Sequence, residues 1–260
     1  MIESLQNKQI KNIIELQTKV KERKKQELFI VEGTKMIAEI PPIFFDKLFL
    51  SEEYYKQSAV GEIKRLPVEF EIVKNSIFKK MSGTKTPQGI LAIVKQRQYQ
   101  IEELLTNKHP LLMVLEDLQD PGNLGTIIRT SEGAGVDGII LTKNSVDIYN
   151  PKVVRATMGS IFRMPFYISK ELDKELIKLK EHNVKLYAAH LQGEKYYYKE
   201  KYNNSGVAFL IGNESNGLSN KTIKKADSLI KIPLYGQVES LNASIAASIL
   251  MYEASNQRRK

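Results

Sequence analysis

The stretch DPGNLGTIIRTSEGAG, residues 120–135, links a glycine-containing turn to a helical pattern three residues after the apolar run LLMVLE. Turns of this kind often hold a phosphate through backbone N–H groups at the start of a helix. Gly122 and Gly125 are three residues apart and no lysine follows, so the stretch matches neither the dinucleotide fingerprint nor the P-loop. The prominent polar side chains are instead the amide of Asn123 and the guanidinium of Arg129.

Two more polar loops follow predicted strands. The loop IGNESNGLS comes after the strand VAFL and carries Glu214 between two glycines. The loop IPLYGQVESLNASIAASI opens a helix of small residues with Ser240, Asn242 and Ser244. Each of these side chains, taken alone, is explained by helix capping or a tight turn. One Arg, one Glu, two Asn and two Ser at one sheet edge exceed what capping requires, so together they indicate a site.

The elements around these loops must position them. From residue 106 onward, strand patterns alternate with helix patterns, which predicts a mostly parallel sheet covered by helices on both faces. In such sheets, ligands bind outside the carboxyl ends of the strands. We therefore expect the three loops to meet at one edge of the sheet, in a domain of residues 106–260.

Residues 1–105 also alternate short strands with helices and predict a separate small α/β domain. A helix is expected from Lys8 to Val20, followed by a basic turn, KERKK, and the strand LFIVEG. Another helix is expected over EEYYKQSAVGEIKRL. The polar segment QYQIEELLTNKHP, residues 98–110, has few strand formers and predicts a linker between the two domains.

The chain has 260 residues, with 39 Lys and Arg against 30 Asp and Glu, and a net charge of +9. This charge favours a polyanionic partner, nucleic acid first, although a lysine-rich composition accounts for it equally well. The absence of Cys excludes disulfides, a thiolate zinc site and a cysteine nucleophile. No run approaches the ~20 apolar residues of a membrane span, and the N-terminus has no apolar signal core. We therefore expect a cytoplasmic protein with no membrane partner.

The three loop motifs DPGNLGTIIRTSEGAG, LIGNESNGLS and IPLYGQVESLNASIAASI resemble, in order and spacing, those of the SpoU/TrmH family, over residues 111–256. The segments KVKERKKQELFIVEGTKMIAE and TPQGILAIV resemble the substrate-binding domain that precedes the catalytic domain in many members. These proteins are S-adenosylmethionine-dependent RNA 2′-O-ribose methyltransferases of the SPOUT class. The resemblance implies a C-terminal sheet tied into a trefoil knot and a homodimer whose active site forms at the subunit interface.

The resemblance also implies roles for individual residues. The family positions that serve the reaction centre correspond to Asn123, Arg129, Glu214, Ser240 and Asn242. The positions that bind S-adenosylmethionine, mostly through backbone groups, correspond to Leu191, Gly212, Ile232, Leu241 and Ser244. The second motif departs from the family pattern, since Asn213 and Ser215 stand where relatives often have smaller residues.

Methyl transfer from a sulfonium requires neither a metal nor a covalent enzyme intermediate, and we predict no metal site. It requires an aligned ribose oxygen and stabilisation of the charge that develops on it. Because a guanidinium has a pKa above ~12, Arg129 is a poor general base. We favour charge stabilisation by Arg129, with a neutral Arg129 in a desolvated site as the alternative. We expect Glu214 and Asn123 to hold Arg129 and the ribose, and Ser240 and Asn242 to orient substrate or cofactor.

The N-terminal domain is expected to select the RNA. Its basic turn carries Lys21, Arg23, Lys24 and Lys25, which are interpreted as phosphate contacts, with a solvated helix end as the alternative. A structured RNA rather than DNA follows from the ribose 2′-hydroxyl that the resemblance implies as methyl acceptor.

The sequence thus predicts an RNA 2′-O-ribose methyltransferase acting on ribosomal RNA, with 23S RNA preferred and transfer RNA second. An antibiotic-resistance methyltransferase would use the same chemistry. A non-catalytic RNA-binding factor for ribosome assembly is the alternative from another class, but it has no need for all of Arg129, Glu214, Ser240 and Asn242. A small-molecule nucleotide enzyme is least favoured, because the phosphate fingerprints are missing.

Overall fold

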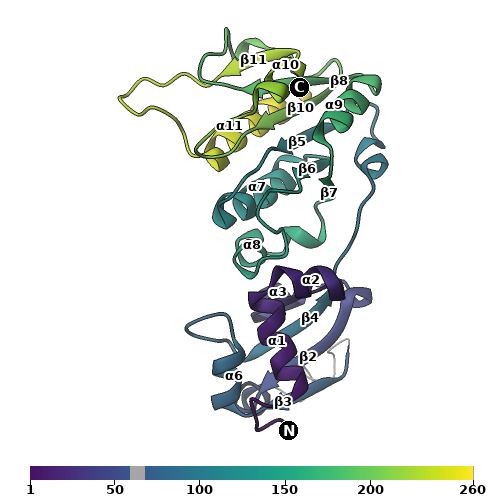
Figure 1. Cartoon of the computed structure of the whole chain (residues 1–260), viewed down its shortest axis with the longest axis vertical. Helices are drawn as coiled ribbons and strands as arrows, with labels where there is room; N and C mark the ends of the chain where they lie inside the picture. The colour runs from purple at the N-terminus through teal and green to yellow at the C-terminus, as the bar shows by residue number, and fades with distance from the viewer. Residues whose placement is uncertain (59–67, 260) are drawn as a thin grey trace. The chain divides into compact units, whose positions relative to one another are not determined.

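The computed structural model describes residues 1–58 and 68–259, and the chain is α/β throughout (Figure 1). It divides into two compact units. The first comprises Met1–Arg97 and Asp147–Phe162, and the second comprises Gln98–Val146 and Arg163–Lys260. The units therefore differ in outline from two continuous stretches divided at residue 105, because residues 147–162 pack with the first unit. None of the described helices is long and apolar enough to cross a membrane.

The first unit contains a mixed four-stranded sheet in the order β1-β4-β2-β3. Strand β4 pairs antiparallel with β1 and β2, whereas β2 and β3 run parallel. The strands are β1 (Leu28–Glu32), β2 (Phe45–Ser51), β3 (Phe70–Val73) and β4 (Ile90–Lys95). The helices are α1 (Lys8–Thr18), α2 (Val20–Gln26), α3 (Thr34–Ala38), η1 (Pro42–Phe44), α4 (Glu52–Gln57), α6 (Asn75–Met81), α8 (Pro151–Thr157) and η3 (Ser160–Phe162).

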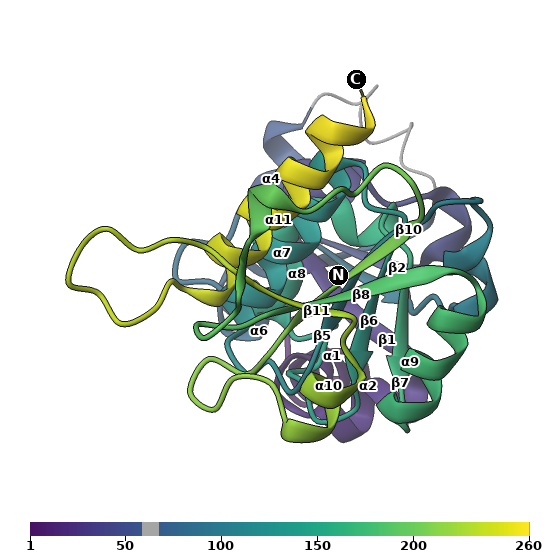
Figure 2. The ribbon, with the colours of Figure 1, turned by 90° about the horizontal axis from the view of Figure 1, so that it is seen from above.

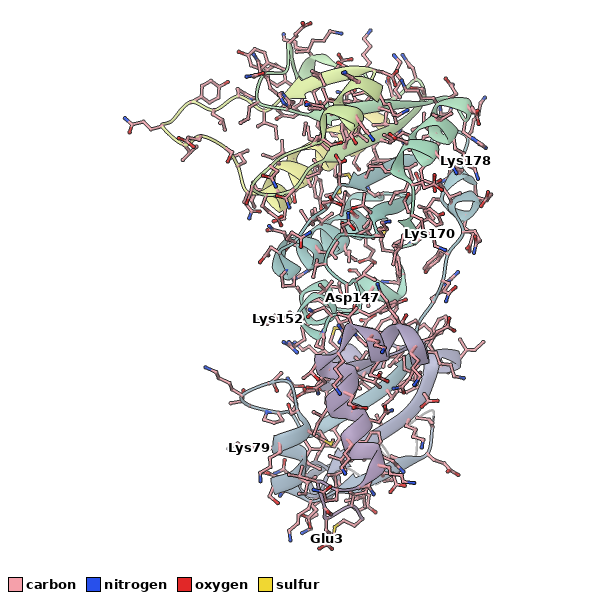
Figure 3. All side chains as sticks on the ribbon, viewed as in Figure 1. Glu3, Lys79, Asp147, Lys152, Lys170 and Lys178 are labelled. Carbon is pink, nitrogen blue, oxygen red and sulfur yellow. The ribbon has the colours of Figure 1, made fainter. Side chains whose placement is uncertain are left out.

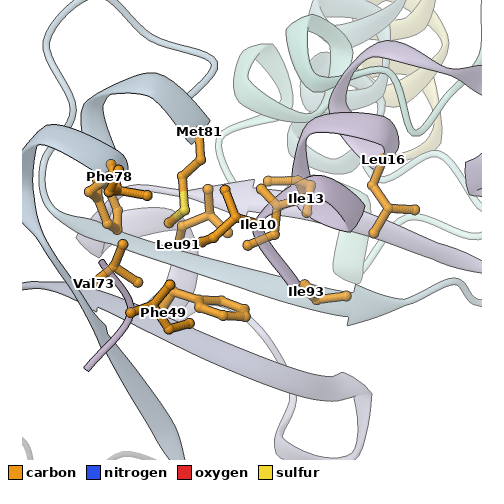
Figure 4. Close-up of a cluster of buried hydrophobic side chains, with 12 residues drawn as sticks. Ile10, Ile13, Leu16, Phe49, Val73, Phe78, Met81, Leu91 and Ile93 are labelled. Atoms are coloured by element: carbon orange, nitrogen blue, oxygen red, sulfur yellow. The ribbon is translucent and has the colours of Figure 1, made fainter. Parts of the chain in front are cut away.

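Helix α1 supplies one side of the core of this unit. Its buried residues Ile10, Ile13 and Leu16 recur at spacings of three, so they share one face of the helix. Figure 4 shows this face beside Phe49 and Ile93 of the sheet. The side chain of Asn7 accepts a hydrogen bond from Gln9 N and caps the helix at its N-terminus.

The stretch KERKK forms part of helix α2 rather than the basic turn that the sequence predicted. Lys, Arg, Glu and Gln are all good helix formers, because their long side chains lose little freedom in a helix. The chain turns only afterwards, at Glu27, whose φ of 55° is left-handed. The helix expected over EEYYKQSAVGEIKRL begins as α4, and the rest of that prediction falls largely on residues 59–67, which lie outside the described residues.

Arg23 of α2 is 1% exposed and lies in the interior of the first unit. Its Nε donates to Asp147 Oδ2 at 2.7 Å, and its Nη1 donates to Leu16 O at 2.7 Å and Gln17 O at 3.2 Å. Asp147, labelled in Figure 3, begins the segment 147–162. This ion pair therefore ties that segment into the unit.

The second unit contains a seven-stranded sheet in the order β7-β6-β5-β10-β8-β11-β9, and every neighbouring pair is parallel. The prediction of a mostly parallel sheet is confirmed. The strands are β5 (Leu111–Leu115), β6 (Gly138–Thr142), β7 (Phe166–Ser169), β8 (Val184–Ala189), β9 (Lys195–Tyr196), β10 (Gly206–Ile211) and β11 (Ser228–Lys231). The strands β5, β6 and β10 are buried along their full length, as expected for a sheet covered on both faces.

Helices cover this sheet on both sides (Figure 2). Helices α7 (Pro121–Ala134) and α11 (Ala243–Arg258) pack against each other, and α11 also packs against β10. Helix α9 (Leu172–Glu181) packs against β8 on the other side. The unit also contains the short elements η2 (Ile101–Leu105), η4 (Tyr197–Lys199) and α10 (Asn220–Lys225).

The segment 98–110 is more than a polar linker. It contains η2, and its side chains Tyr99, Ile101 and Leu104 are buried. Leu104 occupies the space where Gly138 of β6 has no side chain. The prediction missed this packing because the buried residues are few and are separated by polar ones.

The end of α11 is anchored by Arg258. Its guanidinium donates to the carbonyl oxygens of Tyr202, His109, Pro110 and Ser205, at 2.7 to 3.3 Å. Burial lowers the pKa of this guanidinium, which the negative charge of Asp137 partly opposes. Arg258 thus fastens the last helix to the segments that lead into β5 and β10.

Candidate active site

The strands β5, β10, β8 and β11 are consecutive neighbours in the sheet. Because they are parallel, their carboxyl ends lie at the same edge. The loops that leave this edge are residues 116–120, 190–194, 212–219 and 232–242. The sheet thus brings the three motif loops together, as the alternation of strands and helices predicted.

Asn123 connects all three motifs. It lies in the first turn of α7, where Asp120 Oδ1 accepts its backbone N–H at 2.7 Å and Pro121 starts the helix. The side chain of Asn123 donates from Nδ2 to Glu214 Oε1 at 3.0 Å. Its Oδ1 accepts from Asn242 Nδ2 at 2.8 Å. Because one end of the amide donates and the other accepts, these two partners fix its orientation.

Glu214 is held by the start of α7. Besides Asn123, it accepts the backbone N–H groups of Gln119 and Asp120, both at 3.0 Å. Burial raises the pKa of this carboxyl, but the hydrogen bonds from Asn123, Gln119 and Asp120 outweigh burial and lower it. Glu214 is therefore a carboxylate at neutral pH and acts as an acceptor rather than as an acid.

Asn242 caps the last helix. Its Oδ1 accepts from Ser244 N at 2.9 Å, Ser244 Oγ at 2.6 Å and Ile245 N at 3.3 Å. Its Nδ2 is thereby aimed at Asn123. A continuous chain of hydrogen bonds runs from Glu214 through Asn123 and Asn242 to the N-terminus of α11. Capping and site formation are here done by the same residues.

The second motif folds into a tight turn in which Asn213 is a structural residue. Asn213 and Gly217 form an antiparallel bridge, and Asn213 Oδ1 accepts from Ser215 N at 2.9 Å and Asn216 N at 3.1 Å. A Cβ at Gly212 would collide with the backbone of Gly217, so only glycine fits there. The departure from smaller residues therefore builds the turn that presents Glu214.

A cavity of about 680 Å³ opens between the loops that follow β8, β10 and β11. Four of the predicted cofactor residues line it, namely Leu191, Gly212, Ile232 and Leu241. The predicted reaction-centre residues Glu214, Ser240 and Asn242 also line it. Ser244 does not, because it is buried behind Asn242 and bonds to that side chain.

The cavity fits S-adenosylmethionine. Its volume lies within the range of ~300–1,000 Å³ typical of small-molecule sites. Leu191, Leu241 and Leu250 offer an apolar wall to an adenine ring, and Glu239 and Asn242 add polar groups. The backbone groups of residues 232–241 have no hydrogen-bonding partner among the described residues, so they are available to a ligand. No cluster of metal-binding side chains occurs in the described part of the chain.

Arg129 lies apart from this network. It is exposed on α7 and does not line the cavity. Its guanidinium has no hydrogen bond or ion pair with any residue between 1 and 58 or between 68 and 259. The side chains of Glu214 and Asn123 bond to each other, to backbone N–H groups and to Asn242, and not to Arg129. The expectation that these two side chains hold Arg129 is therefore not met within one chain.

Sequence reasoning passed over Glu116, which follows β5 directly. Its carboxylate accepts from Ser219 N at 2.9 Å and from Thr222 Oγ1 at 3.0 Å, which joins the loop after β5 to the end of the second motif and to α10. Asp120 was also passed over, although an Asp before Pro at the start of a helical pattern is a capping signal. The pairing of Glu116 with α10 had no local signal.

The second candidate surface is helix α2. Lys21, Lys24 and Lys25 are exposed there, whereas Arg23 is buried and paired with Asp147. Arg23 is therefore unavailable to phosphate in this structure. Arg23 is buried because it lies on the inner face of helix α2. An exposed turn, as the sequence predicted, has no such inner face.

Comparisons with known proteins identify the family of this chain. A model of the SpoU rRNA Methylase family matches residues 110–252, and a model of the MRM3-like substrate binding domain matches residues 7–92. The chain is 34% identical over 257 residues to 23S rRNA (guanosine(2553)-2′-O)-methyltransferase RlmP of Bacillus subtilis, covering 96% of this chain and 97% of the relative. It is 30% identical over 301 residues to human rRNA methyltransferase 3, mitochondrial, covering 91% and 69%.

Among solved structures, the AdoMet-bound rRNA methyltransferase from Sinorhizobium meliloti has a TM-score of 0.84 and 30% identity, with 98% of this chain and 97% of that chain covered. Fold and site define an S-adenosylmethionine-dependent RNA 2′-O-ribose methyltransferase of the SPOUT class. The chain belongs to the SpoU rRNA methylase family. Membership implies the trefoil knot in the second unit.

Proposed function

We propose that this methyltransferase modifies the ribose of a nucleotide in 23S ribosomal RNA, in the cytoplasm. The observation that carries the catalytic assignment is the chain of hydrogen bonds from Glu214 through Asn123 to Asn242 beside the cavity. Ribosomal RNA is favoured over transfer RNA because two relatives named as rRNA methyltransferases match more than nine tenths of the chain. Those matches include the region of the substrate-binding domain, residues 7–92.

The residues divide the work as follows. S-adenosylmethionine supplies the methyl group when it is bound. Leu191, Gly212, Ile232 and Leu241 hold it through the loops that line the cavity. Glu214, Asn123 and Asn242 keep these loops in register, and Ser240 orients the substrate at the cavity rim. Ser244 acts through its hydrogen bond to Asn242.

Arg129 stabilises the negative charge that develops on the ribose 2′-oxygen as its proton leaves. A guanidinium keeps its own proton at neutral pH, and its planar array of donors suits an oxyanion or phosphate. Its exposed position without an intramolecular partner among the described residues supports a role that is completed only when RNA or a second subunit is present.

The protein acts as a homodimer in which Arg129 of one subunit serves the cavity of the other. The separation of Arg129 from the cavity residues of its own chain supports this arrangement. Mixing two inactive variants tests it directly. Arg129→Ala and Asn242→Ala subunits, refolded together, should regain activity at one of the two sites of the mixed dimer. No recovery in verified mixed dimers would show that Arg129 serves its own subunit.

The two predicted domains share the task. Residues 1–105 bind and select the RNA, and residues 106–260 carry out the transfer. In the first domain, Lys21, Lys24 and Lys25 contact phosphates, while Arg23 supports their helix from inside.

The decisive experiment is methyl transfer from labelled S-adenosylmethionine to RNA and ribosomal particles from a strain lacking this protein. Wild type, Arg129→Ala and the surface control Lys170→Ala would be compared, and ribose-methylated positions mapped. We expect wild type and Lys170→Ala to label one 23S nucleotide, and the guanosine in the name of the B. subtilis relative is the first position to inspect. Label in transfer RNA would contradict the proposal that 23S ribosomal RNA is the substrate. Absence of label on all substrates would favour a non-catalytic assembly factor.

A further inference from the structure

The segment EKYYYKEK, residues 194–201, forms the outer edge of the seven-stranded sheet as β9 and η4. Neither the three motifs nor the cavity lining includes it. Tyr196 and Tyr198 are 40% and 42% exposed there, although burying an aromatic ring away from water is favourable. Exposed aromatic side chains that gather in one place mark an interaction surface.

These rings are ordered relative to each other. The rings of Tyr196 and Tyr198 lie parallel, with centroids 5.5 Å apart and an interplanar angle of 4°. Lys231 Nζ lies 5.2 Å from the centroid of Tyr196, and Lys199 Nζ lies 5.7 Å from that of Tyr198. Aromatic faces and cations are therefore interleaved, which is the composition of surfaces that bind single-stranded nucleic acid.

A third ring belongs to the same surface. Tyr235, in the loop that follows β11, is 93% exposed. Tyr235 lies four residues after Lys231, whose ammonium group lies 5.2 Å from the centroid of the Tyr196 ring, so this loop starts beside the tyrosine pair. Desolvation raises the pKa of Tyr198, and the phenols of Tyr235 and Tyr196 raise it further. Tyr235 lies five residues before Ser240 in the loop that lines the cavity.

The surface adjoins the cofactor cavity. Tyr196 of β9 is paired in register with Lys231 of β11, and Lys231 lines the cavity. The approach of this segment to β11 depends on Gly193, where a Cβ would lie 2.7 Å from the carbonyl carbon of Ile230. Tyr196 therefore lies next to a residue that lines the cavity, although the tyrosines themselves do not line it.

The charge of the segment suits an RNA backbone. The segment carries three lysines, at 195, 199 and 201, against two glutamates, at 194 and 200, and Lys231 of the adjoining strand β11 adds a fourth positive charge. Glu200 accepts from Lys195 at 2.9 Å and from Ser228 at 3.1 Å, so its charge is already paired. Lys199 and Lys231 keep their ammonium groups beside the rings.

We propose that Tyr196, Tyr198 and Tyr235, with Lys199 and Lys231, form a stacking platform for unpaired bases of the RNA that flank the nucleotide to be methylated. The platform rests on the proposed function, since it specifies which part of the RNA the catalytic domain holds. RNA is favoured over a protein partner because a base offers a planar face to each ring while its phosphate meets the lysines.

Photocrosslinking tests the platform without requiring methyl transfer. The full-length protein would be irradiated with a single-stranded RNA of about 12 nucleotides carrying 5-bromouridine, a length within the site sizes of such surfaces. Crosslinked residues would be identified by mass spectrometry. We expect crosslinks at Tyr196, Tyr198 or Tyr235 and none at Tyr55, an equally exposed tyrosine of the first unit. Crosslinks confined to other residues would overturn the platform.

Steady-state kinetics give the second measurement. Replacing the three tyrosines by Leu should raise KM for the RNA roughly tenfold or more. Each base stacked on an aromatic ring contributes about 1–3 kcal/mol to the binding free energy, so the loss of one such base suffices for this change. Replacement by Phe should restore KM, because Phe retains the stacking face. The affinity for S-adenosylmethionine, measured by calorimetry, should be unchanged in both variants. An unchanged KM in the Leu variant would refute the proposal.

The alternative is that a second copy of this chain, rather than RNA, covers the tyrosines. Sedimentation of the Leu variant distinguishes the two. If the Leu variant loses activity because it becomes a monomer, the surface is a subunit contact and the proposal is wrong. If wild type methylates no RNA but still crosslinks through these tyrosines, the proposed function fails while the RNA-binding surface stands.

Discussion

Helices α2 and α7 each carry an arginine that sequence patterns marked as functional, and the two arginines have opposite surroundings. Arg23 of α2 is buried, pairs with Asp147 and donates to two backbone carbonyls. Arg129 of α7 is exposed, and its guanidinium has no hydrogen-bond or ion-pair partner in the described part of the chain. Removing one partner of a buried ion pair destabilises a fold, because the other charge is left uncompensated, whereas a charge left free at a site is available to a substrate. The comparison predicts effects on folding for Arg23 and on catalysis for Arg129.

The largest effect is expected at Arg129. Arg129→Ala should lower the rate of methyl transfer about 100-fold or more, the usual loss when a group that stabilises a developing charge is removed. Arg129→Lys should also lose most activity, because an ammonium lacks the planar fork. Urea unfolding should show a change in free energy below about 0.5 kcal/mol, since the side chain has no partner among the described residues. Near-normal turnover of Arg129→Lys would remove the assigned role.

The converse result is expected at Arg23. Arg23→Ala leaves Asp147 and two carbonyl groups without their donor, and should lower the free energy of unfolding by about 3 kcal/mol. Chemical denaturation measures this change, with the exposed neighbour Lys24→Ala as the control. Methyl transfer per folded molecule should stay close to normal. If the Arg23→Ala variant is stable but binds RNA weakly, Arg23 contacts the RNA and the structural role assigned to it is wrong.

A smaller effect is expected from the exposed face of α2. Changing Lys21, Lys24 and Lys25 to Gln should weaken RNA binding about tenfold and reduce the salt slope by about 0.7 for each phosphate that the variant no longer neutralises. The comparison variant changes Lys79 and Lys80, which are exposed on α6 of the same unit. If the α2 variant and the Lys79 and Lys80 variant have equal salt slopes, the lysines of α2 do not contact RNA phosphates and are only solvated.

The smallest effect concerns the pH dependence of Glu214. Its pKa in the folded protein is below the ordinary value of 4.5, so its hydrogen bonds stabilise the fold above that value and are lost as the pH falls through the lowered pKa. Glu214→Gln should cost about 1 kcal/mol at pH 7, a modest figure because the residue is exposed to screening water. The difference from wild type should shrink in acid. Denaturation curves at pH 7 and pH 3 measure it, and a constant difference would contradict the assignment.

Much of the catalytic unit was open to prediction from local pattern. Apolar runs such as LLMVL and GVAFLI read as buried strands, and the polar loops after them had to meet because parallel strands end at one edge. The convergence of Glu214, Asn123 and Asn242 follows from that rule. Their individual hydrogen bonds could not be predicted from the sequence and are seen only in the tertiary structure. Asn213 is an example, since the sequence marked it only as a departure from the family pattern, whereas its side chain organises the turn of the second motif.

The amino-acid sequence alone determined the motifs, the order of the functional loops along the chain and the parallel class of the sheet, because periodicity and capping are encoded within a few residues. Only the tertiary structure decided which charged groups are buried. Asp147 meets Arg23 across 124 residues, and the segment 147–162 packs with the first unit although its sequence neighbours belong to the second. The ammonium group of Lys231 likewise reaches the ring of Tyr196 only because β9 pairs with β11. Such long-range pairing depends on how distant faces fit together, and no local pattern records it.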